Sequence, residues 1–212
     1  SRLKTYIGGN DPSSADGQAL GTASLEWSDL YLADGSVIYF GNDQEIKVTH
    51  VADTGLTLKH TATADDKPIT LTLQTGETDM AANDVIGKIA FQAPDEGTGT
   101  DAILVAAAIQ ARSEGDFAAD ANATSLDFML GASEAAATLM TLNSSGNFSV
   151  GDGTAALPSY SNTGDLNTGV YFPAADTVGV VAGGVEQFRF GSNPIPGGSK
   201  NLFHNGDFAV AQ

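Results

Sequence analysis

The sequence contains no cysteine, which excludes disulfide bonds and thiolate metal sites as sources of stability. Long apolar runs are also missing, and no stretch approaches the ~20 apolar residues that a membrane-spanning helix requires. Residues 1–9 lack the apolar centre of a secretory signal peptide. We therefore expect no membrane insertion, and we expect stability to come from burial and strand pairing.

Basic residues are scarce as well. The chain has 9 Lys and Arg residues against 26 Asp and Glu residues, a formal net charge of −17. Such a charge repels phosphate backbones and anionic membrane surfaces, so a nucleic-acid partner is not expected. Two of the basic residues, Arg2 and Lys4, lie in the first four positions. They either contact an acidic partner or simply solvate a mobile end.

Aromatic residues make up only 8% of the chain, with a single tryptophan, whereas glycines number 25. Hydrophobic residues reach 42%, but few of them are large. This composition suits many short strands joined by tight turns better than one thick core. The composition therefore predicts an all-β and elongated fold.

Short segments with alternating apolar residues, separated by turn signals, run along the chain. In the first part they predict four strands in succession, with Asp34-Gly35 as a hairpin turn. Their ranges are 25–32, 36–41, 45–51 and 55–61. Further strands are predicted at 68–75, 85–94, 124–133 and 137–151, and a loop at 158–169 is followed by strands that meet at Gly183-Gly184.

Two alanine-rich segments, 102–111 and 133–140, have the composition of helices. Neither segment has a polar face wide enough for an exposed amphipathic helix, and helix propensity is a weak guide by itself. We therefore expect both segments to be strands or strand-plus-turn.

The stretch VIGKIAFQAP…TSLDFMLGAS…ATLMTLNSSGNFSVG resembles a module common in bacteriophage tail fibres. In that module a Gly-Lys or Gly-Arg strand, a strand ending in small residues and a closing SSGN-x-x-x-G recur. GDGTAALPSYSNTGDLNTGVYFPAADTVGVVAGGVEQFRFG is similar to a second fibre module, with a GD-x-NTG turn and a GG-x-E hairpin. LGTASLEWSDLYLADGSVIYFG resembles the first repeat unit of tail proteins from aquatic phages. Together these stretches cover most of residues 19–191.

The resemblance implies a homotrimer whose three chains wrap around one axis, as interwound strands or β-prism-like tiers. Thin strands rich in small residues bury little surface in a lone chain, so three copies would supply the missing core. The Asn143 to Asn147 ending would turn the chain from one packed tier into the next. The implied organisation is a tail-anchoring arm at 1–18, β modules at 19–60, 61–151 and 152–192, and a linker with the start of a further distal domain at 193–212.

The function implied is that of a structural virion component, a tail fibre or tailspike segment. It would attach to other phage tail proteins at its N-terminal end and project a distal domain onto the host surface receptor. Arg2, Lys4 and Tyr6 are the candidate contacts of the tail anchor, because a mobile arm before the first module can order on a partner. The chain would be the virion-proximal part of a longer polypeptide.

Two alternatives from other classes remain open. The first is a polysaccharide-depolymerase tailspike, for which the single Trp27 is poor support as a sugar platform. The acid pairs Asp65-Asp66 and Asp95-Glu96 are expected to be solvated loop charges and not a glycosidase pair. The second is a glycan-binding module within residues 152–191. No enzymatic activity, cofactor or metal is expected.

Three weaker motifs have simpler explanations. Gly97 and Gly99 fit a loose dinucleotide pattern, but no βαβ unit surrounds them, so we expect a hairpin loop. Residues 165–169 place oxygen ligands at alternate positions but lack the remaining ligands of a calcium loop, which favours a plain turn. The three histidines, His50, His60 and His204, have no partner at catalytic motif spacing, and the first two are expected on adjacent strand faces.

Overall fold

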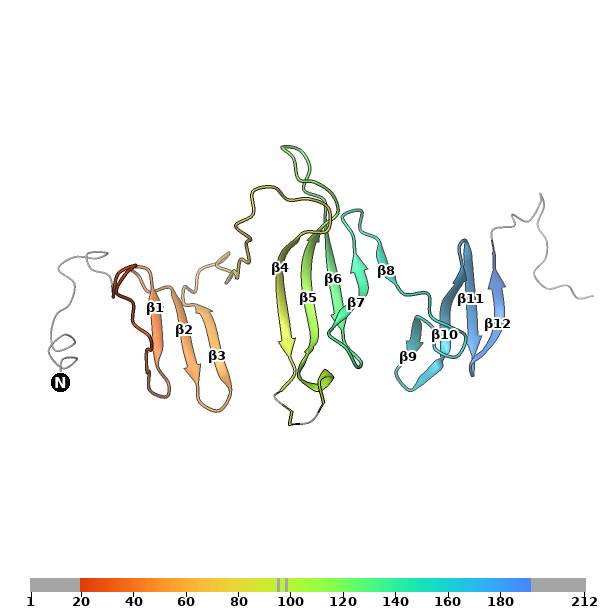
Figure 1. The fold of residues 1–212 in the computed structure, drawn as a ribbon, viewed down its shortest axis with the longest axis horizontal. Coiled ribbons are helices and arrows are strands. Elements are labelled where there is room, and N and C mark those ends of the chain that lie inside the picture. The colour runs from red at the N-terminus through yellow and green to blue at the C-terminus, as the bar shows by residue number, and fades with distance from the viewer. Residues whose placement is uncertain (1–19, 95, 98, 192–212) are drawn as a thin grey trace, which may run out of the picture. The chain divides into compact units, whose positions relative to one another are not determined.

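The computed structural model describes residues 20–94, 96–97 and 99–191. In this part the fold is all-β, with three antiparallel sheets built from twelve strands, as predicted (Figure 1). The chain divides into two compact units, Ser1–Thr72 and Leu73–Gln212, and each is described by itself. Over the described residues, no helix has the length and apolar character to cross a membrane.

The first unit holds a three-stranded sheet of β1 (Val37–Phe40), β2 (Ile46–Val51) and β3 (Gly55–His60) in that order. Directly paired residues in a sheet project to the same side. Ile38 pairs with Val48, which pairs with Leu58, so one face of this sheet is apolar. The opposite face carries polar groups such as the paired Lys47 and Lys59.

The strand predicted at 25–32 is wrong. An isolated bridge joins Thr22 and Leu25, and residues 26–32 have no strand assignment. The Asp34-Gly35 step is a turn, closed by a 3.1 Å hydrogen bond from the Ser36 amide to the Ala33 carbonyl. The predicted hairpin does not form there, because β1 pairs with β2 and not with the residues before the turn. The physical reason is packing: Leu30 and Leu32 line a hollow together with Ile38 on the apolar face of the sheet, so this stretch lies over the face and does not pair with the free edge of β1.

The second unit begins with a five-stranded sheet whose strands follow one another in chain order. A short 3₁₀ turn, η1 (Asp101–Ile103), precedes the second strand. The strands are β4 (Val85–Gln92), β5 (Val105–Ser113), β6 (Thr124–Leu130), β7 (Ala137–Leu142) and β8 (Phe148–Val150). Segment 102–111 thus forms part of η1 and β5, and segment 133–140 is a turn followed by β7. Both alanine-rich segments are therefore strand-plus-turn, as predicted.

The Asn143 to Asn147 ending turns the chain within this sheet and not into another tier, so that expectation was wrong. It joins β7 to β8 as a tight hairpin, in which the Asn143 amide donates to the Asn147 carbonyl at 3.0 Å. The Asn143 side-chain oxygen accepts the amides of Ser145 (3.1 Å) and Asn147 (2.8 Å), as Asx turns do. The Ser144 amide donates to Glu114 at 2.9 Å, which ties the turn to the end of β5.

The second sheet of this unit contains β9 (Tyr160–Asn162), β10 (Asp165–Ala174), β11 (Thr177–Ala182) and β12 (Val185–Phe190), in the order β12-β11-β10-β9. Gly183 and Gly184 have φ angles of +59° and +76°, as a two-residue type I′ hairpin requires, and this predicted hairpin is confirmed. The predicted loop at 158–169 is wrong, because its residues form β9 and the start of β10. A tight turn at 162–165 lets these two strands pair.

The strand predicted at 68–75 has no strand assignment in the structure. The chain passes through residues 67–77 without a turn or a bend, but no strand of the described residues pairs with it. Alternation of Ile69, Leu71 and Leu73 with polar residues gives this segment the pattern of a strand, but a pattern supplies no hydrogen-bonding partner.

Gly169 is a point where a side chain has no room. A Cβ atom at this position would lie 1.8 Å from the Tyr160 carbonyl oxygen of β9. We expect Gly169→Ala to push β9 away from β10 and to destabilise the fold by about 1–3 kcal/mol. Thermal unfolding followed by circular dichroism measures the effect. Gly151→Ala is the matched control, since no atom lies within 4 Å of a Cβ at that position, and equal melting temperatures for the two variants would contradict the predicted clash.

Candidate functional site

The five-stranded sheet has one face that is apolar across three neighbouring rows, with the paired Ser113 and Thr124 beyond them at one end. Its central row crosses all five strands and consists of Ile89, Ile109, Phe128, Met140 and Val150. A second row contains Gly87, Ala111, Leu126, Leu142 and Phe148, and a third contains Phe91, Ala107, Leu130 and Ala137. We call this surface the apolar face of the five-stranded sheet.

Much of this apolar face is open to solvent. The exposed fractions are 47% for Ile89, 56% for Phe91, 36% for Ile109, 38% for Leu126, 51% for Leu130, 39% for Leu142 and 48% for Phe148. At roughly 200 Å² for a whole side chain, these residues leave on the order of 600 Å² of apolar surface in water. That is the upper end of what a soluble monomer normally exposes, so the face has the character of an interaction surface.

The opposite face of the same sheet is polar and is closed by its own hydrogen bonds. The carboxylate of Asp127 in β6 has no exposed surface. It accepts two hydrogen bonds from Arg112, one from Nε at 2.7 Å and one from a terminal guanidinium nitrogen at 3.2 Å. It accepts two more, from Thr141 Oγ1 at 2.9 Å and from Gln110 Nε2 at 3.2 Å. Arg112 also donates to the Asn83 side-chain oxygen at 3.0 Å. We call this group the Asp127 network.

The electrostatics of the Asp127 network follow from this geometry. Hydrogen bonds from Arg112 lower the pKa of Asp127, against the effect of burial, and the carboxylate in turn raises the pKa of Arg112. Because both carboxylate oxygens already accept hydrogen bonds from within the chain, the network is suited to holding strands β5, β6 and β7 in register. It is not suited to binding a ligand.

The sheet of β9 to β12 has the same division between its faces. One face carries the row Tyr160, Val170, Val180 and Phe188, and Phe188 is 63% exposed. On the other face, Arg189 forms a bidentate pair with Glu186, with its Nε 2.9 Å from Oε1 and a terminal nitrogen 2.6 Å from Oε2. The buried Tyr171 hydroxyl donates to Glu186. That hydrogen bond raises the pKa of Tyr171, and the guanidinium of Arg189 lowers the pKa of Glu186.

The apolar face of the first unit is hollowed. The hollow has a volume of about 290 Å³. Its lining residues are Leu30, Leu32, Ala33, Ser36, Ile38, Val48, His50 and Leu56. His50 in β2 and His60 in β3 lie on adjacent strands, as expected. The His50 ring accepts a hydrogen bond from the Gly35 amide at 3.4 Å, and its Nδ1 lies 3.7 Å from the Asp34 carboxylate.

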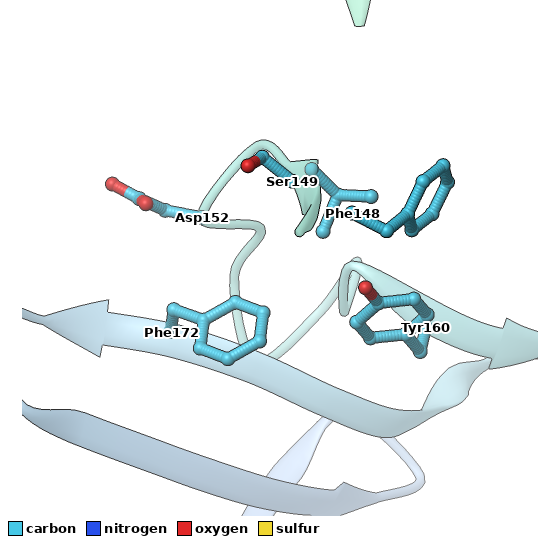
Figure 2. Close-up of a pocket in the computed structure, with 6 residues that line it drawn as sticks. Phe148, Ser149, Asp152, Tyr160 and Phe172 are labelled. Carbon is cyan, nitrogen blue, oxygen red and sulfur yellow. The ribbon is translucent and has the colours of Figure 1, made fainter. Parts of the chain in front are cut away.

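A second hollow, of about 220 Å³, lies where β8 leads into the last sheet. Figure 2 shows the rings of Tyr160 and Phe172 rising from their strands toward the segment that carries Phe148. The two rings meet edge to face, with centroids 6.3 Å apart. The Asp152 carbonyl accepts the Phe172 amide at 2.8 Å, which fixes the connection to the sheet. Rings that pack against each other in this way form an apolar joint and not a flat platform for a sugar.

The anchor candidates Arg2, Lys4 and Tyr6 lie outside the described residues. The Gly97 and Gly99 motif falls in the connection between the antiparallel strands β4 and β5, as expected for a hairpin loop. Residues 165–169 open strand β10, so the turn predicted there was wrong. In the ranges that the structure describes, no group of three or more His, Cys, Asp or Glu residues could hold a metal ion.

Comparisons of this chain with protein-family models, with curated proteins and with solved structures found no match. The function proposed below is therefore inferred from the geometry of the described residues.

Sequence reasoning missed the Asp127 network. A signal was present, because Asp127 and Arg112 are the charged residues of two mainly apolar strand segments, LDFML and AILVAAAIQAR. A charge in such a position is costly to bury unless it is paired. The pairing itself could be found only once the register placed Gln110 opposite Asp127 and Arg112 diagonally next to it.

Removal of the cation tests the role of the Asp127 network. We expect Arg112→Ala to destabilise the fold by about 3–5 kcal/mol, because it leaves a buried carboxylate without its ion partner. Denaturant unfolding measures this loss. Lys88→Ala, which removes an exposed cation from the neighbouring strand β4 on the same face, is the control and should change stability by no more than about 0.5 kcal/mol. Equal effects of the two variants would mean that the network contributes nothing.

The lowered pKa of Asp127 also predicts a pH dependence. Its stabilising contribution is complete above the ordinary aspartate pKa of 3.8 and is lost as pH falls through the lower pKa of the folded state. Melting temperatures between pH 2 and pH 7 should therefore fall more steeply toward acid for the parent chain than for Asp127→Asn. Identical slopes would contradict the ion pair. Other carboxylates titrate in both proteins, so the difference between the two curves is the quantity to compare.

Proposed function

We propose that this chain is a segment of a homotrimeric phage tail fibre or tailspike, with a structural and not a catalytic role. The observation that carries the proposal is shared by the three sheets: each has one face of apolar side chains, several of which are exposed. The buried apolar side chains of the described residues, Ala108, Ala136, Tyr171 and Val181, are too few to form a core for even one sheet. Further copies of the chain would supply the second layer that each face lacks.

The magnitudes favour association. At about 25 cal/mol per Å², covering on the order of 600 Å² on the five-stranded sheet contributes about 15 kcal/mol per chain. Association costs about 4–15 kcal/mol for each step, and two steps assemble three chains. The apolar faces of the other two sheets add to this gain. A trimer held in this way is stable without cysteine, metal or cofactor.

The distribution of residue size also supports close packing of copies about an axis. Three alanines, Ala107, Ala111 and Ala137, lie among the large side chains of the apolar face. Small residues let neighbouring backbones approach, while Phe91, Leu130 and Phe148 supply volume between them. The polar faces, with the Asp127 network and the Tyr171, Glu186 and Arg189 group, would then lie on the outside of the trimer.

The charge of the chain fits this arrangement. With −17 per chain, three copies carry a large negative charge on polar outer faces, which opposes lateral clumping of assembled fibres. In the virion, residues 1–18 with Arg2, Lys4 and Tyr6 would attach to a tail protein, and a domain beyond residue 193 would meet the host receptor. Several fibres that each bind weakly then give strong attachment where their geometry allows simultaneous contact.

A pair of variants on adjacent residues tests the proposal. Phe91 lies on the apolar face and Ala90 on the opposite face of β4, and both are exposed. We expect the parent chain to have a mass of about three times 21.6 kDa by light scattering. Phe91→Glu, which puts a charge on the surface to be covered, should lower that mass, whereas Ala90→Glu should leave it unchanged. A parent chain that stays monomeric across concentrations would overturn the proposal.

A further inference from the structure

The segment Pro68–Thr75 has the composition of a strand but no partner in the described chain. Its sequence, PITLTLQT, alternates apolar residues with threonine and glutamine and contains no charge. Residues 68–74 are exposed. No backbone hydrogen bond joins the amides or carbonyls of 68–75 to any other described residue. Uncharged segments of high β-propensity that stay exposed are aggregation sites, so a soluble assembly has to pair or cover this one.

The segment has a reason not to pair with the sheet edge of its own chain. Strand β4 lies at the edge of the five-stranded sheet, with β5 as its single neighbour in the sheet order. Leu73, however, lies over the apolar face of β4. A Cβ atom on Gly87 would come within 2.8 Å of the Leu73 Cβ. A chain that crosses the face of a strand at this point cannot also run alongside its edge.

The chain that follows the segment is held in place. The Asp84 carboxylate accepts the Ala81 amide at 2.7 Å, and the Phe117 amide donates to the Met80 carbonyl at 2.9 Å. Ser113 accepts the Asp84 amide at 3.0 Å and donates to the Ala81 carbonyl. Residues 80–84 are therefore clamped to the end of β5 and to the loop after it, and the segment 68–75 precedes this fixed point.

We propose that residues 68–75 of one copy add as a strand to the open edge of β4 in a neighbouring copy, an inference that rests on the proposed trimer. The lengths match, since β4 (Val85–Gln92) has 8 residues, as the segment does, whereas the other edge strands of this unit are shorter, with 3 residues in β8, 3 in β9 and 6 in β12. Every copy offers one segment and one such edge. A head-to-tail contact of this kind closes into a ring and leaves neither unpaired.

Hydrogen exchange on the intact chain, with residue-level resolution, tests this pairing. The oligomeric mass is measured first on the same sample. In a trimer, we expect amides within 69–74 to exchange on the order of 100-fold more slowly than those of the equally exposed residues 63–66. Amides at the open edge of β4 should be slowed as well.

The possible outcomes separate the two proposals. A trimer in which 69–74 exchanges as fast as 63–66 overturns the strand pairing and leaves the proposed function standing. Protection of 69–74 without protection of the β4 edge overturns the choice of β4 as acceptor. A monomeric chain overturns the proposed function, and with it this inference.

Proline substitution gives a second and independent readout. Consecutive amides of a strand point to opposite edges, so Thr70→Pro combined with Leu71→Pro removes one backbone donor from each edge, whereas Thr70→Ala combined with Leu71→Ala keeps both. We expect the proline variant to melt at least about 4 °C below the alanine variant. Equal melting temperatures of two trimeric variants would contradict pairing of the segment, because proline has little effect where no amide is hydrogen-bonded.

Discussion

The constraint on which this structure depends is that a β-sheet with one apolar face needs a second layer. A single chain here builds three such sheets, and the described residues cover their apolar faces only in part. Within each sheet, neighbouring strands are paired, and the polar faces of the two sheets in the second unit carry internal hydrogen-bond networks. The exposed apolar surface is the part of the structure without a partner, so the free energy of folding and assembly depends mainly on how that surface is covered.

The two polar networks and the apolar faces are complementary parts of one arrangement. The Asp127 network fixes the register of β5, β6 and β7, and a one-residue slip in any of them would move its large side chains to the opposite face. The Glu186 and Arg189 pair spans a bulge between β11 and β12 in the last sheet. Charge pairing on one face thereby defines which residues reach the other.

The sequence predicted the all-β class and the alanine-rich strands because both depend on local patterns. Segments 102–111 and 133–140 lack a polar helical face, and that is decisive without tertiary information. The partner of each strand could not be predicted in the same way. Segments 25–32 and 68–75 alternate as well as β2 does, but pairing depends on residues distant in the sequence, so the pattern alone predicted ladders that the described chain does not form.

The candidate site shows the same limit. The sequence shows that β4 to β8 are apolar, but it does not show whether a given leucine faces water or a core. Leu126 and Asp127 are neighbours, and only the register assigns the first to the apolar face and the second to a buried ion pair. The anchor residues Arg2, Lys4 and Tyr6 remain a prediction, because they lie outside the described residues.

Strand order has a consequence for how the chain reaches its folded form. Every ladder in the three sheets joins strands that are consecutive in the sequence. Loop closure between such strands is fast, because the entropy lost on closing short connections is small. Each sheet can therefore form as soon as its strands leave the ribosome, whereas covering the apolar faces waits on a collision between chains. Maturation of the proposed fibre would then be a concentration-dependent reaction, and its rate in an infected cell would follow the level of synthesis.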